Sequence, residues 1–353
     1  MSLADEILFE RRGAAGLITL NRPQALNAVT HDMVRALRAQ LAAWVYDAAI
    51  TRVLITAAEG RAFSAGGDIR HLYDLGKGGR RVEALKFWRD EYPLNLAIKK
   101  YRKPYVALID GIVMGGGVGV SVHGSHRVAG DRYSFAMPEV GIGFFPDVGA
   151  TWFLPRMPGE LGAYCALTGE RFGTADACAA GLATHCIPSR RFAGLLEDLS
   201  GTAPVDAVLA AFAVPAGAGP IMMRRAVIDR LFASDRVEDI LSALDREAGS
   251  DGGDAEWAGK TAATMRRKSP LSLKIALAQV RRGKNWDFET CMRAEFRIVS
   301  RVIEDHDFYE GVRAVIVDKD NKPRWQPATL AAVSEEEVER HFASRAGEEL
   351  ALP

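Results

Sequence analysis

The chain of 353 residues is long enough to bury the core of one large domain with an appendage, or of two domains. Its 45 basic and 45 acidic residues give a formal net charge of zero, which argues against a nucleic-acid-binding protein that relies on a broad basic face. The acidic and polar start, residues 1–6, resembles neither a secretory signal nor an arginine-rich transit leader, and the weakly polar stretch 111–122 is too short to cross a bilayer.

Side chains that commonly bind metals are scattered along the chain. The four cysteines form neither a C-x-x-C motif nor a paired framework, which predicts a reduced, cytoplasmic setting. His123 and His126 have no third ligand at metal spacing, so we expect a structural role for both. From these patterns we predict no metal site, no nucleic-acid partner and no membrane segment.

The first elements expected are two short strands and a helix. Residues 7–10 and 16–20 predict a hairpin at the start of a sheet, and Pro23 ends the second strand because proline cannot continue a ladder. Thr30 is the expected N-cap of a helix with one apolar face. That face consists of Met33, Leu37, Leu41 and Val45.

The next elements expected are a buried strand at 53–56 and a turn at Gly66 and Gly67 that leads into a helix. Asp68 lies near the first turn of this helix, where its negative charge favours the helix dipole. Residues 80–103 then predict a long helix, whose basic end complements its C-terminus.

The stretch 104–149 carries the densest chemical information. Its apolar run 105–109 has the length and β-branched character of a buried strand, and Gly115, Gly116 and Gly117 follow where that strand should turn into a helix. Such a turn lets backbone N–H groups point at an oxygen that becomes negative, as acyl transfer requires. Taken alone, the cluster more often indicates only a tight turn with close packing. It does not match the dinucleotide-binding fingerprint.

Two carboxylates follow in apolar sequence that is rich in glycine and proline. They are Glu139 and Asp147, and little water is expected to reach them there. Burial raises the pKa of a carboxyl group, and a raised pKa suits acid–base chemistry. From spacing alone, a surface or capping role is still the more frequent one for either acid.

Helices are expected over most of the second half of the chain. The Ala-, Pro- and Gly-rich stretch 203–220 predicts a boundary between a core with the active site at 1–205 and a helical region at 206–353. The helices expected on both sides of it are 151–155, 161–168, 174–181, 222–232, 237–247, 254–267, one that begins at Pro270, and 290–304.

Six motifs, in chain order, carry a resemblance to a known family. They are Asn21-Arg-Pro-Gln-Ala-Leu-Asn27, Phe63-Ser-Ala-Gly-Gly-Asp-Ile-Arg70, Met114-Gly-Gly-Gly-Val-Gly-Val-Ser-Val-His-Gly124, Phe135-Ala-Met-Pro-Glu139, Phe145-Pro-Asp-Val-Gly149 and Asp318-Lys-Asp-Asn-Lys-Pro-Arg-Trp325. The set resembles the crotonase (enoyl-CoA hydratase/isomerase) superfamily and, within it, the 3-hydroxyisobutyryl-CoA hydrolases. The resemblance covers nearly the whole chain. It implies a crotonase-like α/β fold of repeated ββα units with a helical C-terminal region.

Carried over residue by residue, the resemblance implies that Gly67 and Gly116 supply the two N–H groups of an oxyanion hole. It implies that Glu139 is the catalytic carboxylate, either as a nucleophile or as the base that activates water. Asp147 falls where the hydrolases keep an acid beside the reacting acyl group. Glu91 matches an acid that lines the acyl pocket and can meet a substrate hydroxyl.

The resemblance also implies substrate binding by Ala65, Asp68 and Arg22. Arg22 is a candidate for the CoA phosphates, since a guanidinium suits phosphate geometry, and a turn arginine without a ligand is an equal alternative. The partner expected is an acyl-CoA, and because CoA is part of the substrate we expect no separate cofactor.

One departure from the true hydratases bears on the reaction. Those enzymes use two glutamates, the first inside the helix that begins at the glycines, and that position here is Gly119. The resemblance therefore implies hydrolysis of a short 3-hydroxyacyl-CoA thioester, 3-hydroxyisobutyryl-CoA of valine degradation being the best candidate. The alternatives are an enoyl-CoA hydratase or isomerase that uses Glu139 alone, and a non-catalytic acyl-CoA binder. A homotrimer or higher oligomer is the assembly that the family suggests.

Overall fold

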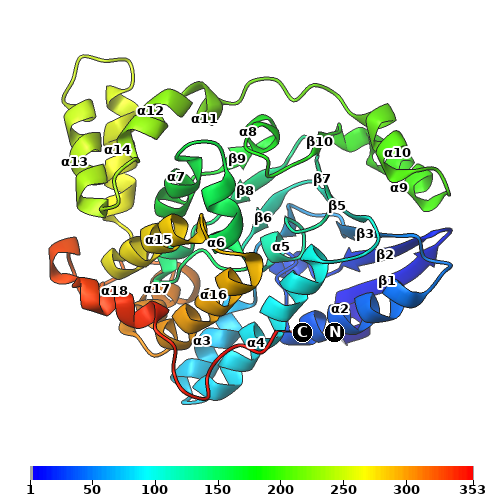
Figure 1. The fold of residues 1–353 in the computed structure, drawn as a ribbon, viewed down its shortest axis with the longest axis horizontal. Helices are drawn as coiled ribbons and strands as arrows, with labels where there is room; N and C mark the ends of the chain where they lie inside the picture. The colour runs from blue at the N-terminus through cyan, green and yellow to red at the C-terminus, as the bar shows by residue number, and fades with distance from the viewer. Residues whose placement is uncertain (1–2, 353) are drawn as a thin grey trace. The chain divides into compact units, whose positions relative to one another are not determined.

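Two compact units make up the chain in the computed structural model, which describes residues 3–352 (Figure 1). Among the described residues, the first unit contains 3–68, 90–136 and 171–223, and the second contains 69–89, 137–170 and 224–352. This division differs from the predicted segments 1–205 and 206–353, because 69–89 and 137–170 pack with the C-terminal helices. Residues 1–2 and 353 lie outside the described residues. Part of the prediction about the start of the chain falls on residues 1–2.

A six-stranded sheet forms the centre of the first unit, in the strand order β1-β2-β3-β5-β7-β10. Its strands are β1 (Ile7–Arg12), β2 (Ala15–Leu20), β3 (Arg52–Ala57), β5 (Tyr105–Ile109), β7 (His126–Ala129) and β10 (His185–Cys186). β1 and β2 form the predicted antiparallel hairpin, and the other neighbouring strands are parallel. The buried strands predicted at 53–56 and 105–109 are confirmed as β3 and β5.

A smaller four-stranded sheet contains the second strand of three successive strand pairs. Its strands, in spatial order, are β4 (Ala62–Ser64), β6 (Ile112–Met114), β8 (Ser134–Ala136) and β9 (Phe172–Gly173). In the pairs β3–β4, β5–β6 and β7–β8 the first strand joins the large sheet and the second joins the small one. The predicted architecture of repeated ββα units is thereby confirmed.

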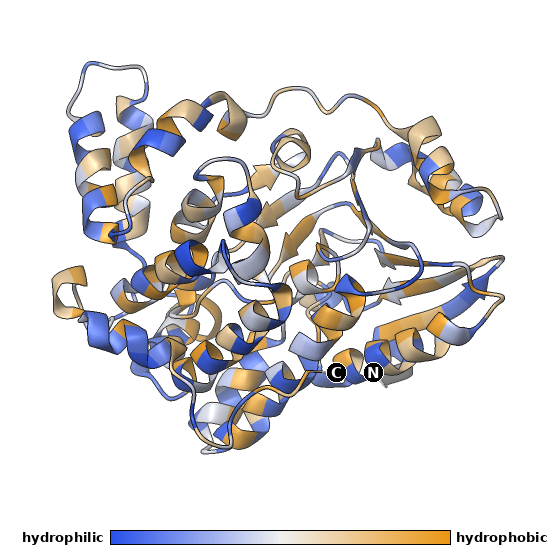
Figure 2. Ribbon diagram, in the orientation of Figure 1, coloured by the Kyte–Doolittle hydropathy of each residue, from blue (hydrophilic) through white to orange (hydrophobic). Residues whose placement is uncertain are grey.

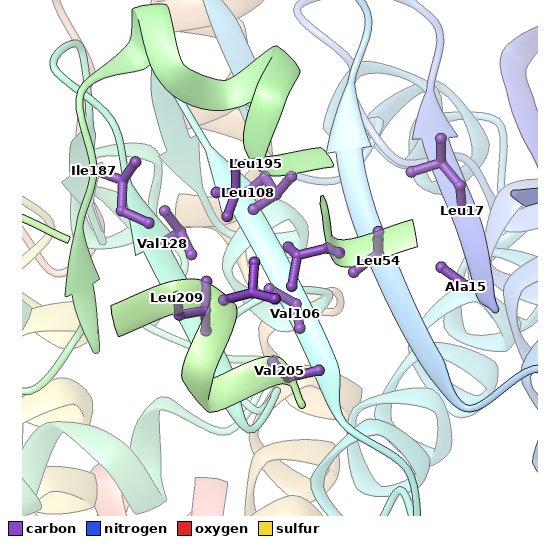
Figure 3. Packing of buried hydrophobic residues seen from close by; sticks show 12 residues of the cluster. Ala15, Leu17, Leu54, Val106, Leu108, Val128, Ile187, Leu195, Val205 and Leu209 are labelled. Carbon is purple, nitrogen blue, oxygen red and sulfur yellow. The ribbon is translucent and has the colours of Figure 1, made fainter. Parts of the chain in front are cut away.

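Two helices cover one face of the large sheet (Figure 3). They are α9 (Phe192–Ser200) and α10 (Val205–Phe212), and their Leu195 and Leu209 lie against Leu54, Val106 and Val128 of the strands. Each fully buried aliphatic side chain of this kind contributes about 1.5–3 kcal/mol to the free energy of unfolding. The sheet is therefore a rigid support for the loops that leave its strands.

The remaining helices of the first unit are mostly short. They are α1 (Leu3–Glu6), α2 (His31–Tyr46), the second part of α4 (Arg81–Lys99), α5 (Gly116–Gly119), α8 (Thr174–Ala179) and α11 (Pro220–Met223), with 3-10 turns at Pro23–Ala25 and Ser189–Arg191. Thr30 caps α2 as predicted, because its hydroxyl accepts from the Met33 N–H at 3.2 Å. The predicted helix over 80–103 ends at Lys99.

The second unit is built from helices. They are α3 (Ile69–Lys77), the start of α4, α6 (Ala150–Phe153), α7 (Leu161–Thr168), α12 (Arg225–Leu231), α13 (Val237–Ala248), α14 (Ala255–Arg266), α15 (Pro270–Gly283), α16 (Phe288–Val302), α17 (His306–Val312) and α18 (Glu335–Phe342), with shorter turns at Glu139–Ile142, Leu154–Arg156, Arg313–Val317 and Leu330–Ala332. The single helix predicted over 222–232 is divided between α11 and α12. Figure 2 shows that α13 and α14 carry both hydrophilic and hydrophobic residues, as amphipathic helices do.

The buried α7 is the helix on which much of the second unit packs. Every residue of α7 is buried, and α12, α14 and α15 contact it. Ser269 begins α15 by accepting from the Ser272 N–H at 3.1 Å, which confirms the predicted start at Ser269 and Pro270. None of the helices among residues 3–352 is sufficiently long and apolar to span a membrane.

Candidate functional site

Two backbone turns of the first unit bring Gly67 and Gly116, named here the glycine pair, close together. Gly67 follows β4, and the Val29 N–H holds the preceding turn by donating to the Gly66 carbonyl at 2.8 Å. Gly116 begins α5 after Gly115, whose φ of 44° is one that glycine adopts at little cost. A Cβ added to Gly116 would lie 3.1 Å from the Gly67 nitrogen, so the two N–H groups are neighbours.

Neither N–H of the glycine pair donates a hydrogen bond to a described residue. Gly116 is buried and Gly67 is half-buried. A buried N–H without an acceptor is rare and costs free energy, so such a group is a candidate for binding a ligand oxygen. Two adjacent donors of this kind are what an oxyanion hole requires.

Glu91 lies beside the glycine pair. It is on α4, is only 2% exposed, and its Oε1 would be 2.9 Å from a Cβ added to Gly116. The structure thus brings Gly67, Gly116 and Glu91 together, although they are separated by more than twenty residues in sequence. One helical turn later, Asn95 is fully buried and neither of its amide atoms hydrogen-bonds to a described residue. Asn95 could not be predicted from the sequence as a site residue, because an asparagine on a long helix carries no local signal.

The predicted CoA-phosphate ligand Arg22 is held by the protein itself. Its guanidinium forms ion pairs with Glu6 at 3.2 Å and Asp68 at 3.3 Å, and it donates to the Ala28 carbonyl at 2.7 Å. These contacts position the side chain of Asp68 near the loop that ends in Gly67. Ala65 donates its N–H to the Leu26 carbonyl at 2.9 Å. The phosphate contact of Arg22 stays a prediction.

Glu139 lies in the second unit, at the first position of the turn Glu139–Ile142. It is 7% exposed, and its Oε2 accepts no hydrogen bond from a described residue. Burial holds the pKa of the Glu139 carboxyl well above its usual range, and the charge of Asp147 raises that pKa further, whereas Lys268 lowers it. A carboxyl group in this state is a strong base once it is ionised.

Asp147 lies in a tight turn, residues 146–151, named here the acidic turn. It is 5% exposed. Val148 has a φ of 53° and Gly149 a φ of 90°, and a β-branched residue adopts such a positive φ only at a cost of about 1–3 kcal/mol. The Ala150 N–H closes the turn by donating to the Asp147 carbonyl at 3.0 Å. The structure therefore holds Asp147 and Glu139 as two buried acids of one unit.

Two side chains that interact with these acids could not be predicted from the sequence. Glu295 of α16 is fully buried and accepts from the N–H groups of Gly149 and Thr151, at 2.7 and 2.9 Å. Lys268 is close enough to Glu139 to lower its pKa, and burial lowers the pKa of Lys268 itself. Glu295 lies on a helix rich in charged residues and Lys268 follows two arginines, and a solvent-exposed side chain is the usual expectation in such sequence.

Other features of the described residues point away from further sites. No three His, Cys, Asp or Glu side chains gather in residues 3–352 in a way that could hold a metal ion. A groove of about 740 Å³ between α15, α16 and α18 contains none of the predicted site residues. Its Arg282 and Arg340 pair with Glu339 and Asp305, and we assign the groove to the packing of these helices.

The first unit thus offers two adjacent N–H donors and a buried acid, and the second offers two more buried acids. Donors of this kind stabilise the oxyanion of an acyl-transfer reaction, and a buried carboxylate can act as nucleophile or base. The chain matches the family model described as enoyl-CoA hydratase/isomerase over residues 15–342.

Curated relatives cover nearly the whole chain. The protein named "3-hydroxyisobutyryl-CoA hydrolase, mitochondrial" from Danio rerio is 44% identical over 349 residues, with 96% of this chain and 90% of the relative covered. The protein of the same name from Homo sapiens is 40% identical over 357 residues, with 98% and 91% covered.

Two solved structures are closely similar in fold. One is titled a carnitinyl-CoA dehydratase from Mycobacterium thermoresistibile, with a TM-score of 0.92, 43% identity and 98% of each chain covered. The other is titled an enoyl-CoA hydratase from Rhodobacter sphaeroides 2.4.1, with a TM-score of 0.91, 37% identity, and 98% of this chain and 100% of that chain covered. The predicted crotonase-like fold is confirmed. The chain belongs to the enoyl-CoA hydratase/isomerase family.

Proposed function

We propose that this protein hydrolyses a short 3-hydroxyacyl-CoA thioester, with 3-hydroxyisobutyryl-CoA as substrate and 3-hydroxyisobutyrate and CoA as products. The observation that carries the proposal is the identity of 44% to a relative named for this hydrolase, over 96% of the chain. This substrate places the enzyme in valine degradation. The relatives' names include the word mitochondrial, and a cytoplasmic location for this chain stays a prediction.

In the proposed mechanism, the N–H groups of Gly67 and Gly116 donate to the thioester carbonyl oxygen. Their lack of other acceptors supports this role, because no existing hydrogen bond must break when the substrate binds. As the acyl carbon becomes tetrahedral, its oxygen gains negative charge, and both hydrogen bonds become stronger. This differential strengthening lowers the barrier of the reaction.

Glu139 supplies the nucleophile, directly or through water. If Glu139 attacks, a mixed anhydride forms, the C–S bond breaks and water then cleaves the anhydride. If Glu139 acts as a base, it takes a proton from water, the water oxygen bonds to the acyl carbon, and the CoA thiolate leaves. The buried position and raised pKa of Glu139 support either role. Single turnover in ¹⁸O-water distinguishes them, since only the anhydride route can place label in the Glu139 carboxyl group.

Asp147 and Glu91 recognise the 3-hydroxyl group and position the water in this proposal. Both carboxyl groups are buried, at 5% and 2% exposure. A site with buried groups that hydrogen-bond to a substrate hydroxyl discriminates strongly against an analogue that lacks the hydroxyl. The acids therefore support a preference for hydroxylated acyl groups.

Hydration or dehydration of a carbon–carbon double bond is the second candidate reaction. The titles of the two similar structures favour it, since they name a dehydratase and a hydratase. Against it, α5 contains Gly119 where a hydratase of this family carries its first glutamate, and Gly119 has no side chain that could activate water. A non-catalytic acyl-CoA binder is the third candidate, and any turnover excludes it.

Parallel assays on the purified protein test the proposal. Release of free thiol from 3-hydroxyisobutyryl-CoA reports hydrolysis, and loss of enoyl absorbance from crotonyl-CoA reports hydration. We expect rapid thiol release and little loss of enoyl absorbance. Fast hydration with no thiol release would replace the proposal with the second candidate. The predicted homotrimer or higher oligomer is tested separately by the mass of the protein in solution.

A further inference from the structure

The acidic turn is held by two buried side chains from distant helices. Gln279 of α15 donates to the Pro146 carbonyl at 2.6 Å, and Glu295 of α16 accepts from the N–H groups of Gly149 and Thr151. Both side chains are 0% exposed. The Ala150 N–H also donates to the backbone carbonyl of Asp147. The hydrogen bonds together hold the backbone before and after Asp147.

The turn needs such support because its backbone is unfavourable. Val148 has a φ of 53°, a conformation that a β-branched residue rarely adopts, and it persists only when surrounding contacts impose it. Without Glu295, the N–H groups of Gly149 and Thr151 would lose their acceptors inside the protein. An unpaired buried N–H costs about 1–3 kcal/mol, so the turn would gain by rearranging.

From these contacts we infer that Glu295 is a positioning residue for Asp147, because its carboxyl group fixes the turn from which the Asp147 side chain projects. The inference deepens the proposed function and rests on it for the role of Asp147 in recognising the 3-hydroxyl. It concerns only residues of the second unit, which pack within one body. The sequence gives no local sign of this role, since α16 is more than a hundred residues away from the turn.

The protonation state of Glu295 adds a second observable. Burial and, to a smaller extent, the charge of Asp147 raise the pKa of its carboxyl group to about 8, although the hydrogen bonds from Gly149 and Thr151 lower it. The titratable groups that face Glu295 are Asp147 and Cys291, and the Cys291 thiol has a pKa raised by burial to about 12. Glu295 is therefore protonated at neutral pH, and it becomes an anion that repels Asp147 as the pH rises through about 8.

The test compares Glu295→Gln with a matched control, Asp176→Asn. Asp176 is also a buried acid that accepts from two backbone N–H groups at a helix start, those of Ile221 and Met222, but it lies in the first unit and holds no residue of the proposed site. Hydrogen–deuterium exchange is measured on peptides that cover 145–153 and 219–223. We expect faster exchange at 145–153 only in Glu295→Gln, and at 219–223 only in Asp176→Asn. Unchanged exchange at 145–153 in Glu295→Gln would overturn the inference.

Steady-state kinetics supply a second measurement, which would not change if Glu295 had only a structural role. The ratio of kcat/KM for 3-hydroxyisobutyryl-CoA to that for isobutyryl-CoA should fall by about tenfold or more in Glu295→Gln and stay unchanged in Asp176→Asn, because a displaced Asp147 no longer meets the hydroxyl. In the wild type this ratio should decline near pH 8, and in Glu295→Gln that decline should be absent. A wild-type ratio in Glu295→Gln at every pH would contradict the inference.

A second variant and a separate outcome cover the cases in which Glu295→Gln does not fold or the wild type is inactive. If Glu295→Gln does not fold, Glu295→Asp replaces it: the shorter acid cannot reach both N–H groups, so it should show the same changes in smaller measure. A folded Glu295→Asp with wild-type exchange and ratio would overturn the inference. If the wild type releases no thiol from any acyl-CoA, the proposed function fails, and the exchange experiment still decides whether Glu295 fixes the turn.

Discussion

The glycine pair of the first unit and the acidic turn of the second unit solve different physical problems. The glycine pair needs two N–H groups to remain without acceptors and no side chain to stand in front of them. The acidic turn must keep the Asp147 carboxyl group buried although its backbone is strained. This requires hydrogen bonds with Glu295 and Gln279 of other helices. One half of the proposed chemistry therefore depends on the absence of local acceptors and side chains, and the other half depends on contacts from distant residues.

The largest expected effect comes from the acidic side of the comparison. Glu139→Gln removes the ionisable group but keeps the shape of the side chain, so we expect kcat for thiol release to fall by at least about 10²–10⁴-fold. The melting temperature should change little. The control is Glu304→Gln, whose exposed carboxylate pairs with Arg345. Glu139 would have no part in the reaction if its variant remained within a few-fold of the wild type.

The glycine side is tested by Gly116→Ala. The new Cβ would lie 2.9 Å from Glu91 Oε1 and 3.1 Å from the Gly67 nitrogen, where the substrate oxygen should bind. Loss of one oxyanion donor costs about 10²–10³-fold in kcat, and we expect a loss of that size. Gly173→Ala is the matched control, because no heavy atom lies within 4 Å of the added Cβ. Equal kcat values for the two folded variants would show that the donors lie elsewhere.

The pH dependence of the reaction probes the environment of Glu139. Because burial raises the pKa of Glu139 and its ionised form is the active one, kcat/KM should fall as the pH drops through a value above the usual range for glutamate. Lys268 lowers this pKa, so Lys268→Gln should move the acid limb of the profile to higher pH. A shift in the opposite direction would remove Lys268 from the surroundings of Glu139.

The smallest expected effect separates stability from chemistry. Ser334 caps α18 by accepting from the Glu337 N–H at 3.1 Å, and neither half of the proposed site includes it. Ser334→Ala should lower the free energy of unfolding by about 1 kcal/mol in chemical denaturation, with kcat unchanged. A large loss of kcat in this variant would mean that activity follows general stability, and the interpretation of the other variants would then weaken.

These differences explain how much could be predicted from the sequence. The hairpin, the strand at 105–109, the cap at Thr30 and the start of α15 depend on local patterns, and the structure confirms all four. The prediction that Gly67 and Gly116 lie close together rested on a family resemblance, since no spacing rule joins two turns on different strands.

The residues that were missed depend on tertiary contacts. Glu295 lies on an amphipathic helix whose pattern predicts a surface acid, yet the fold buries it against Gly149 and Thr151. Asn95 and Lys268 are comparable cases. The two compact units were also not foreseen as they are, because stretches 69–89 and 137–170 leave the first unit and return to it, which no composition shift marks.

Substrate discrimination by the wild-type protein tests the account most directly. The measurement is kcat/KM for thiol release from 3-hydroxyisobutyryl-CoA and from isobutyryl-CoA, which differ only in the hydroxyl that Asp147 and Glu91 are proposed to meet. The account predicts a strong preference for the hydroxylated thioester, up to about 10⁴–10⁵-fold for a site built around a hydroxyl. Equal kcat/KM values for the two thioesters would contradict it.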